Sequence, residues 1–390
     1  MKKLICVIAA VSVALLGGCS DKPELIDLSS LESTIDEEVS TPLDTIITSY
    51  QQDSYKKQMI GTSASCTFSG ENMLIYSSLG QDADDSIGSQ TKQFYKLDLK
   101  TGECVPMCTV PGCTHDYDAG TACINNAKIS RPTAVGDDVW YLSHNTIMKQ
   151  SGGTSEVIFE NKFCTEYEES IYRDYEGHKY VLSSFIVDDD SVYLFGPTYT
   201  VRLDRQTMKP EEYIPLSEAM IFSQFVCDGK AYVCNELQEL IMVDYNTKEV
   251  KKLGDQINNA CAYGGMLYYT RYNGGMPSLY CASIDGSGEK KLCDDCYMDF
   301  VIKDGKVFYH NYATGGNLRF YDLSTRQDDV IYDGITACDC IVTAEHIDRI
   351  FAIGEAYKSG GQGICNIIIS VKTDGSGLWT KEIDGTDTIL

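Results

Sequence analysis

The sequence predicts an all-β fold made of repeated four-stranded antiparallel sheets, and three observations lead to this prediction. Tyrosine and glycine are abundant among the 390 residues, at 26 and 33, which is typical of short strands joined by tight turns. Two-residue turns of the Asp-Gly or Gly-Gly type separate apolar strands at several points. These turns also recur at a nearly fixed interval along the chain.

The clearest copy of the repeat covers residues 260–292. An apolar strand turns at Gly264 and Gly265 into a tyrosine-rich strand, and a third strand leads to a turn that begins at Asp285. Asp-Gly and Gly-Gly provide the positive φ angles that two-residue hairpins require. Alternating apolar residues in each strand would then face the neighbouring sheet.

The interval between copies identifies the architecture. The first turns of four successive copies lie at Asp189, Gly229, Gly265 and Gly305, with separations of 40, 36 and 40 residues. A four-stranded propeller blade needs about 40 to 45 residues. Because one blade cannot bury both of its faces, several blades must close into a ring. We count seven copies and predict a seven-bladed β-propeller over residues 59–384, with six or eight blades as the alternatives.

The chain begins with a segment typical of an export signal. Lys2 and Lys3 precede an apolar run that ends at Leu16 and is shorter than the roughly 20 residues that cross a bilayer. Leu16-Gly17-Gly18-Cys19 resembles the lipobox of bacterial lipoproteins. That resemblance implies cleavage of residues 1–18 and a diacylglycerol on the Cys19 thiol. An ordinary secretory signal and an uncleaved anchor are the alternatives.

Residues 19–58 predict a flexible acidic tether, because they are rich in Ser, Thr, Asp and Glu and offer little apolar surface to bury. Residues 385–390 are expected to form a short tail. The net charge of −25 excludes nucleic acid as a partner and disfavours docking on anionic lipid head groups. We therefore expect a protein held at the extracytoplasmic face of the cell membrane by its lipid.

The segment Tyr-Cys-Ala-Ser-Ile-Asp-Gly-Ser-Gly at residues 280–288 supports a family resemblance. The repeat resembles bacterial lipid-anchored propellers that are distantly akin to TolB and to the YWTD propellers of lipoprotein receptors. The resemblance covers roughly residues 60 to 384. Its motifs are those of strands and turns, so it implies a fold and no particular activity.

A cysteine- and histidine-rich insert is expected at residues 104–133, between the first two copies. Cys108, Cys113, His115 and Cys123 follow the pattern C-x4-C-x-H-x7-C. Three thiolates and an imidazole can bind zinc tetrahedrally and so order a loop that has little core. One or two disulfides, for instance between Cys108 and Cys123, and free thiols are the alternatives. Four protein ligands would leave no position for water, so a catalytic metal is disfavoured.

The other cysteines divide into two groups. Five lie within apolar strands, where cysteine behaves as a small hydrophobic residue and is expected to be a buried thiol: Cys227, Cys234, Cys261, Cys281 and Cys365. Two further sets are close pairs that suit either a disulfide or a weak metal site: Cys293 with Cys296, and Cys338 with Cys340.

Two equivalent loops are the candidates for ligand recognition. Tyr272 and Asn273 follow the second strand of one copy, and His310, Asn311 and Tyr312 take the same place in the next. Tyrosine and asparagine on glycine-hinged loops suit stacking and hydrogen bonding to a sugar or peptide. Packing of the tyrosines between blades is the alternative.

The sequence contains no familiar catalytic motif, whether G-x-S-x-G, H-E-x-x-H, a P-loop or a dinucleotide fingerprint. Carboxylates are so numerous that a glycosidase-type pair cannot be located among them. We therefore expect a non-enzymatic, surface-anchored propeller that binds a protein, peptide or glycan. The alternatives are an exported glycan-active enzyme with acidic residues at the propeller mouth, and a scaffold of an envelope complex with an exposed apolar patch.

Overall fold

The computed structural model is a seven-bladed β-propeller, as the repeat predicts. Seven four-stranded antiparallel sheets account for all of its strands among the described residues. The structure describes residues 66–69, 72–77, 93–106, 129–136, 138–143, 145–151, 154–163, 182–216, 221–272, 274–296, 300–311, 316–343, 347–357 and 364–383. All of them lie in the compact unit Leu43–Leu390.

Each blade is built from four consecutive strands. Blade 1 contains β1 (Cys66–Ser69), β2 (Asn72–Ser77), β3 (Gln93–Asp98) and β4 (Cys104–Pro106). Blade 2 contains β5 (Ile129–Val135), β6 (Asp138–Ser143), β7 (Thr146–Ser151) and β8 (Thr154–Glu160). Blade 3 contains β9 (Ser184–Val187), β10 (Ser191–Phe195), β11 (Tyr199–Asp204) and β12 (Pro210–Pro215).

Blades 4 and 5 contain β13 (Ile221–Cys227), β14 (Lys230–Asn235), β15 (Leu240–Asp244) and β16 (Glu249–Gly254); and β17 (Ile257–Tyr263), β18 (Met266–Arg271), β19 (Ser278–Ser283) and β20 (Lys290–Cys293). Blades 6 and 7 contain β21 (Phe300–Lys303), β22 (Lys306–Asn311), β23 (Asn317–Asp322) and β24 (Asp328–Asp333); and β25 (Ile335–Val342), β26 (Arg349–Tyr357), β27 (Ile364–Lys372) and β28 (Trp379–Ile383).

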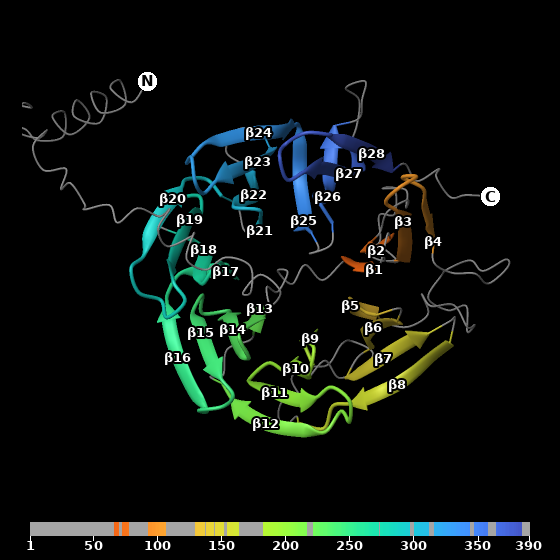
Figure 1. Cartoon of the computed structure of the whole chain (residues 1–390), viewed down its shortest axis with the longest axis vertical. Coiled ribbons are helices and arrows are strands. Elements are labelled where there is room, and N and C mark those ends of the chain that lie inside the picture. Colours follow the sequence, from red (N-terminus) through yellow and green to blue (C-terminus); the bar gives the residue numbers. More distant parts are fainter. Residues whose placement is uncertain are drawn as a thin grey trace, which may run out of the picture. The chain divides into compact units, whose positions relative to one another are not determined.

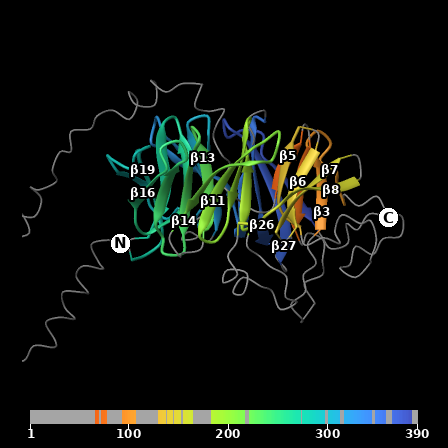
Figure 2. The same cartoon turned by 90° about the horizontal axis from the view of Figure 1, so that it is seen from below.

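The blades follow one another round a ring in chain order, with the first strand of each blade innermost and the fourth outermost (Figure 1). Figure 2 shows the same ring from its edge. Chain order brings blade 7 beside blade 1, and a buried cluster that includes Met73 and Phe351 joins the two. We call this junction the seam, because it is where the ring closes.

The hairpin turns have the conformation that their sequences predict. Left-handed backbone at both central residues is what a two-residue hairpin needs to follow the twist of its strands. The turn residues of blades 4, 5 and 6 have these φ angles: Asp228 51° and Gly229 70°, Gly264 57° and Gly265 76°, Asp304 49° and Gly305 72°.

An aspartate begins the turn between the third and fourth strands of several blades. In blade 4 the Asp244 carboxylate accepts hydrogen bonds from the amides of Asn246 and Thr247, at 2.9 and 3.1 Å. Its second oxygen lies 3.0 Å from Nζ of Lys230. The pKa of Asp244 is held below its usual value, mainly by Lys230 and to a smaller extent by the turn amides. The same kind of turn occurs at Asp98, Asp204, Asp285, Asp322 and Asp374.

Neighbouring blades approach closely where the second turn of blade 6 meets blade 7. Gly316 has a φ of +82°, and a Cβ atom placed on it would lie 1.8 Å from the carbonyl oxygen of Ile335. The amide of Gly334 donates to the carbonyl of Gly316 at 3.0 Å. Only glycine fits this position, because both the backbone conformation and the space exclude a side chain.

The strand cysteines lie in the core, as their apolar neighbours predict. Cys227, Cys234, Cys261, Cys281 and Cys365 are at most 8% exposed. The two close pairs contain no disulfide, because Cys293 and Cys340 are both thiols. Among the described residues no group of three His, Cys, Asp or Glu side chains could hold a metal ion.

Replacement of Gly316 should separate a steric effect from a conformational one. We expect Gly316→Ala to lower the free energy of unfolding by about 2 kcal/mol or more, because the methyl group meets the Ile335 carbonyl. Gly305→Ala is the matched control, since Gly305 has a similar φ of +72° and no atom lies within 4 Å of the position that its Cβ would take. Its cost should be about 1 kcal/mol. If urea titrations gave the same loss of unfolding free energy for both variants, the close contact between Gly316 and blade 7 would make no contribution to the cost of the Gly316 substitution.

The turn aspartates predict a loss of stability in acid. Since their folded pKa values lie below the unfolded ones, the stabilisation is complete above pH ~4 and is lost as the pH falls through the lower folded values. Asp244→Asn keeps an acceptor for the turn amides but removes the charge opposite Lys230. The difference in Tm between this variant and the parent should therefore shrink below pH 4. A difference that stays the same from pH 7 to pH 3 would contradict a stabilising role of the Asp244 charge.

Candidate ligand-binding site

The predicted recognition residues do not form one exposed surface in the described structure. His310 and Asn311 end strand β22 and are only 1% and 6% exposed. Tyr272 follows β18 and is partly buried, and its amide donates to the carbonyl of Gln256 at 3.2 Å. Asn273 and Tyr312 lie outside the described residues.

His310 belongs to the junction between blades 6 and 7. Its Nε2 lies 3.3 Å from the carbonyl oxygen of Ile335, which begins blade 7. Burial lowers the pKa of the imidazole, so the ring is neutral at pH 7. Asn311 pairs in register with Asn317 of the next strand. These contacts fit a packing role for His310.

The predicted zinc ligands Cys108, Cys113, His115 and Cys123 lie outside the described residues, as does the predicted lipidation site Cys19. Cys104 is described, and it begins β4 at the edge of blade 1. It packs against the cluster at the seam. The choice between zinc and disulfides therefore stays a prediction.

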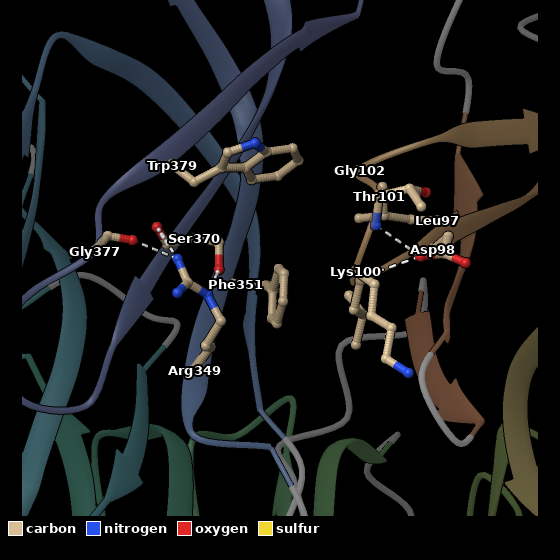
Figure 3. Close-up of a pocket in the computed structure, with 11 residues that line it drawn as sticks. Leu97, Asp98, Lys100, Thr101, Gly102, Arg349, Phe351, Ser370, Gly377 and Trp379 are labelled. Atoms are coloured by element: carbon tan, nitrogen blue, oxygen red, sulfur yellow. Dashed lines mark hydrogen bonds between the residues drawn. The ribbon is translucent and has the colours of Figure 1, made fainter.

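A cavity of about 250 Å³ opens at the seam, between blade 1 and blade 7. One wall is the turn from Asp98 to Gly102 in blade 1, and the other is formed by β26, β27 and β28 of blade 7. Figure 3 shows Arg349 on the blade 7 side, the turn on the blade 1 side, and Phe351 and Trp379 between them. We call this cavity the seam pocket.

Arg349 is the main cationic group of the seam pocket, and all of its hydrogen bonds go to neutral acceptors. Its Nε donates to Oγ of Ser370 at 2.7 Å, and one terminal nitrogen donates to the carbonyls of Ser370, at 3.2 Å, and Gly377. No carboxylate among the described residues forms an ion pair with it. These bonds hold the guanidinium in one orientation beside the cavity.

Other arginines of the propeller have the partner that Arg349 lacks. Arg202 lies 3.0 Å from a carboxylate oxygen of Glu211, Arg319 lies 3.0 Å from Asp328, and Arg271 pairs with Glu289. A carboxylate neutralises a guanidinium and satisfies its parallel N–H groups. Arg349 shares its lack of a carboxylate partner among the described residues with Arg205 of blade 3, but Arg349 is the one that lines the cavity.

The wall from blade 1 is fixed by its own hydrogen bonds and by blade 7. The Asp98 carboxylate accepts from the amides of Lys100 and Thr101, at 2.9 and 2.8 Å, and these bonds lower its pKa. Nζ of Lys381 in β28 donates to the carbonyl of Gly102 at 3.0 Å. Arg349 and Lys100 are therefore the cationic residues that line the pocket, while the Asp98 carboxylate is bonded to the amides of its own turn.

Aromatic rings provide the apolar part of the seam pocket. Phe351 is 3% exposed and packs at 5.6 Å against Phe68 of blade 1. The Trp379 indole is partly buried and lies over Gly102, where a Cβ atom would stand 3.1 Å from the ring. Glycine at this turn thus lets the indole reach across the seam.

Sequence reasoning did not find the seam pocket. Its two walls come from residues 97–102 and 349–379, which are far apart in the chain. No motif links them, and each residue follows the ordinary pattern of its own blade. The one available signal was Trp379, one of only two tryptophans, in a fourth strand.

Comparison with known proteins identifies the fold. No family model matches the chain, and no curated protein matches it. Puromycin hydrolase is similar in structure, with a TM-score of 0.56 and 10% identity over 90% of this chain, which spans 57% of the hydrolase chain. The computationally designed Ika8 protein (TM-score 0.49, 12% identity, 83% of this chain and 88% of that one) and a nidogen/laminin complex (0.40, 12%, 63% and 92%) are less similar. At such identities the likeness extends to the propeller fold alone.

Proposed function

We propose that the chain is a surface-anchored, non-enzymatic binding protein whose seam pocket takes a small organic carboxylate that carries a planar or apolar group. The observation that carries this proposal is the Arg349 guanidinium, bound only to neutral acceptors beside a cavity of about 250 Å³. A half-buried cation without a counter-ion is costly, and an anionic ligand would remove that cost.

The shape of the seam pocket supports a small ligand with two distinct ends. Arg349 would receive the carboxylate, and the Trp379 indole and Phe351 would contact the apolar part. Protein sites for small molecules are commonly apolar cavities with few, well-placed polar groups. The volume of this one suits a molecule the size of an amino acid or an aryl acid.

The hydroxyl groups of the seam pocket support binding rather than catalysis. Ser370 Oγ accepts a hydrogen bond from Nε of Arg349, and Thr101 Oγ1 accepts one from the amide of Glu103 at 3.2 Å. A nucleophilic hydroxyl must also donate its proton to a base, and among the described residues no such acceptor for the Ser370 hydroxyl is found. A donor directed at Ser370 lowers the electron density of its oxygen, which is the reverse of activation.

Attachment to the membrane completes the proposed function. A lipid on Cys19 would hold the propeller at the extracytoplasmic surface, with residues 19–58 as a tether. No helix among the described residues has the length and apolar character of a membrane span. Large apolar side chains exposed on the outer strands come from separate blades: Val157, Tyr213, Val250 and Val330. The exposed pair Tyr357 and Ile364, at the facing ends of β26 and β27, is confined to blade 7. This distribution gives little support to the scaffold alternative, which needs a contiguous patch.

Matched carboxylates and amides test the proposed ligand class. Indole-3-acetate and phenylacetate should bind the full chain, whereas indole-3-acetamide and phenylacetamide should bind at least about 10-fold more weakly, because an ionic hydrogen bond to arginine contributes roughly 1.5 to 3 kcal/mol. Isothermal titration calorimetry at pH 7 measures both. Equal affinities for acid and amide would contradict the role of Arg349.

Two variants locate the binding. Arg349→Gln should remove the preference for the acid over the amide. Arg205→Gln is the control, since Arg205 also donates to backbone carbonyls, those of Asp188 and Asp189 at 3.1 Å, but lies in blade 3. Its preference should equal that of the parent. A preference that survives Arg349→Gln in a folded protein would place the ligand elsewhere.

Lipidation is tested independently of the ligand. In a bacterial host fed an alkyne-tagged fatty acid, the full chain should incorporate the label and partition into the detergent phase of Triton X-114. Cys19→Ser should lose both properties. Cys6→Ser alters a cysteine of the expected leader and should retain the label. Label on the Cys19→Ser protein would rule out the proposed anchor.

A further inference from the structure

Two thiols face each other across the seam. Cys66 lies in β1, the first strand of blade 1, and Cys340 lies in β25, the first strand of blade 7. Their sulfur atoms are 3.7 Å apart although the residues are separated by 274 positions in the chain. The ring thus brings its first and last inner strands together at a pair of cysteines.

The seam has no covalent or strand-exchange connection in the described structure. Blade 1 consists of β1 to β4 and blade 7 of β25 to β28, so neither borrows a strand from the other. The two blades are joined by the buried cluster around Phe351 and Met73 and by the hydrogen bond from Lys381 to Gly102. Every other pair of neighbouring blades is also joined by a chain segment, and the seam is not.

The surroundings of the two thiols are apolar and closed. Cys340 has no exposed surface and Cys66 is partly buried, and both belong to the cluster at the seam. The thiol of Cys340 as hydrogen-bond partner, together with burial, raises the pKa of Cys66 well above its ordinary value. Since only a thiolate attacks a disulfide, the closed ring protects the pair. Reaction therefore requires the seam to open, during folding or by local separation of the blades.

We propose that Cys66 and Cys340 form a disulfide that locks blade 1 to blade 7. The sulfur atoms must approach from 3.7 Å to about 2.05 Å for the bond to form. The oxidant is the disulfide of an exported thiol–disulfide oxidoreductase or of a small thiol such as glutathione. An extracytoplasmic location, where disulfides persist, is consistent with this reaction.

The reaction balances as two successive exchanges. One cysteine thiolate attacks a sulfur of the oxidant, forming a mixed disulfide and releasing one oxidant thiolate. The second cysteine thiolate then displaces the other oxidant sulfur and forms the Cys66–Cys340 bond. Two protons leave the protein thiols, and the oxidant disulfide is reduced by two electrons to two thiols.

Mapping of the bond in the full chain tests the proposal directly. The purified protein is equilibrated with glutathione buffers from fully reduced to fully oxidised, then alkylated, digested without reduction and measured by mass spectrometry. We expect a Cys66–Cys340 cross-linked peptide that increases with the oxidised fraction. A chain closed over this long loop should also migrate faster in a non-reducing gel. The proposal would be overturned if the Cys66–Cys340 peptide were absent at the most oxidising glutathione ratio. Pairing of either residue with Cys104 or Cys338 would overturn it as well.

The effect of the lock on stability distinguishes it from incidental oxidation. Oxidation should raise the Tm of the parent on the order of 5 to 10 °C, because the bond closes a very long loop. Cys66→Ala and Cys340→Ala should show no such rise. Cys234→Ala is the control, since Cys234 is buried in blade 4, and it should retain the rise in full. An unchanged Tm in a parent that carries the mapped bond would show that the bond does not lock the seam.

Discussion

The structure depends on one constraint, which is that a blade cannot bury its own faces. Each four-stranded sheet has two apolar faces, and each is covered only by the sheet beside it. The buried clusters accordingly cross the junctions between blades, such as the one that joins Tyr268 of blade 5 to Val307 of blade 6. Burial at about 25 cal/mol per Å² then stabilises the ring as a whole rather than any blade. Closure of the last junction is what completes the core.

The seam is that last junction, and it differs from the others in its connectivity. At each other junction the chain runs directly from one blade to the next, with at most 23 residues between the last strand of one and the first strand of the other, and this connection limits how far the two blades can separate when their packing is lost. At the seam the partners are separated by most of the chain, so the entropy of closure opposes their contact. Packing around Phe351 and the bond from Lys381 to Gly102 must offset this cost. The seam pocket and the paired thiols both occur at this junction.

The sequence predicted those features that depend on neighbouring residues. Asp-Gly and Gly-Gly turns specify a local backbone, so the number and order of the blades could be read from their spacing. His310 shows the limit, because its position after an aromatic strand resembled the start of a loop, whereas β22 continues through Asn311 and buries the ring against blade 7. Arg349 and the Gly102 turn meet only when the ring closes. No pattern within either segment carries that information.

The location of the seam pocket links ligand binding to ring closure. A ligand that contacts both Arg349 and the Gly102 turn binds only when blades 7 and 1 are together, so it stabilises the closed ring by mass action. A bond between Cys66 and Cys340 would also favour the closed ring, because it would join the inner strands of blades 1 and 7. It would raise the ligand affinity only in proportion to the population of open ring that it removes. Since the packed seam already keeps the pocket walls in place, the lock should slow opening of the ring far more than it tightens binding.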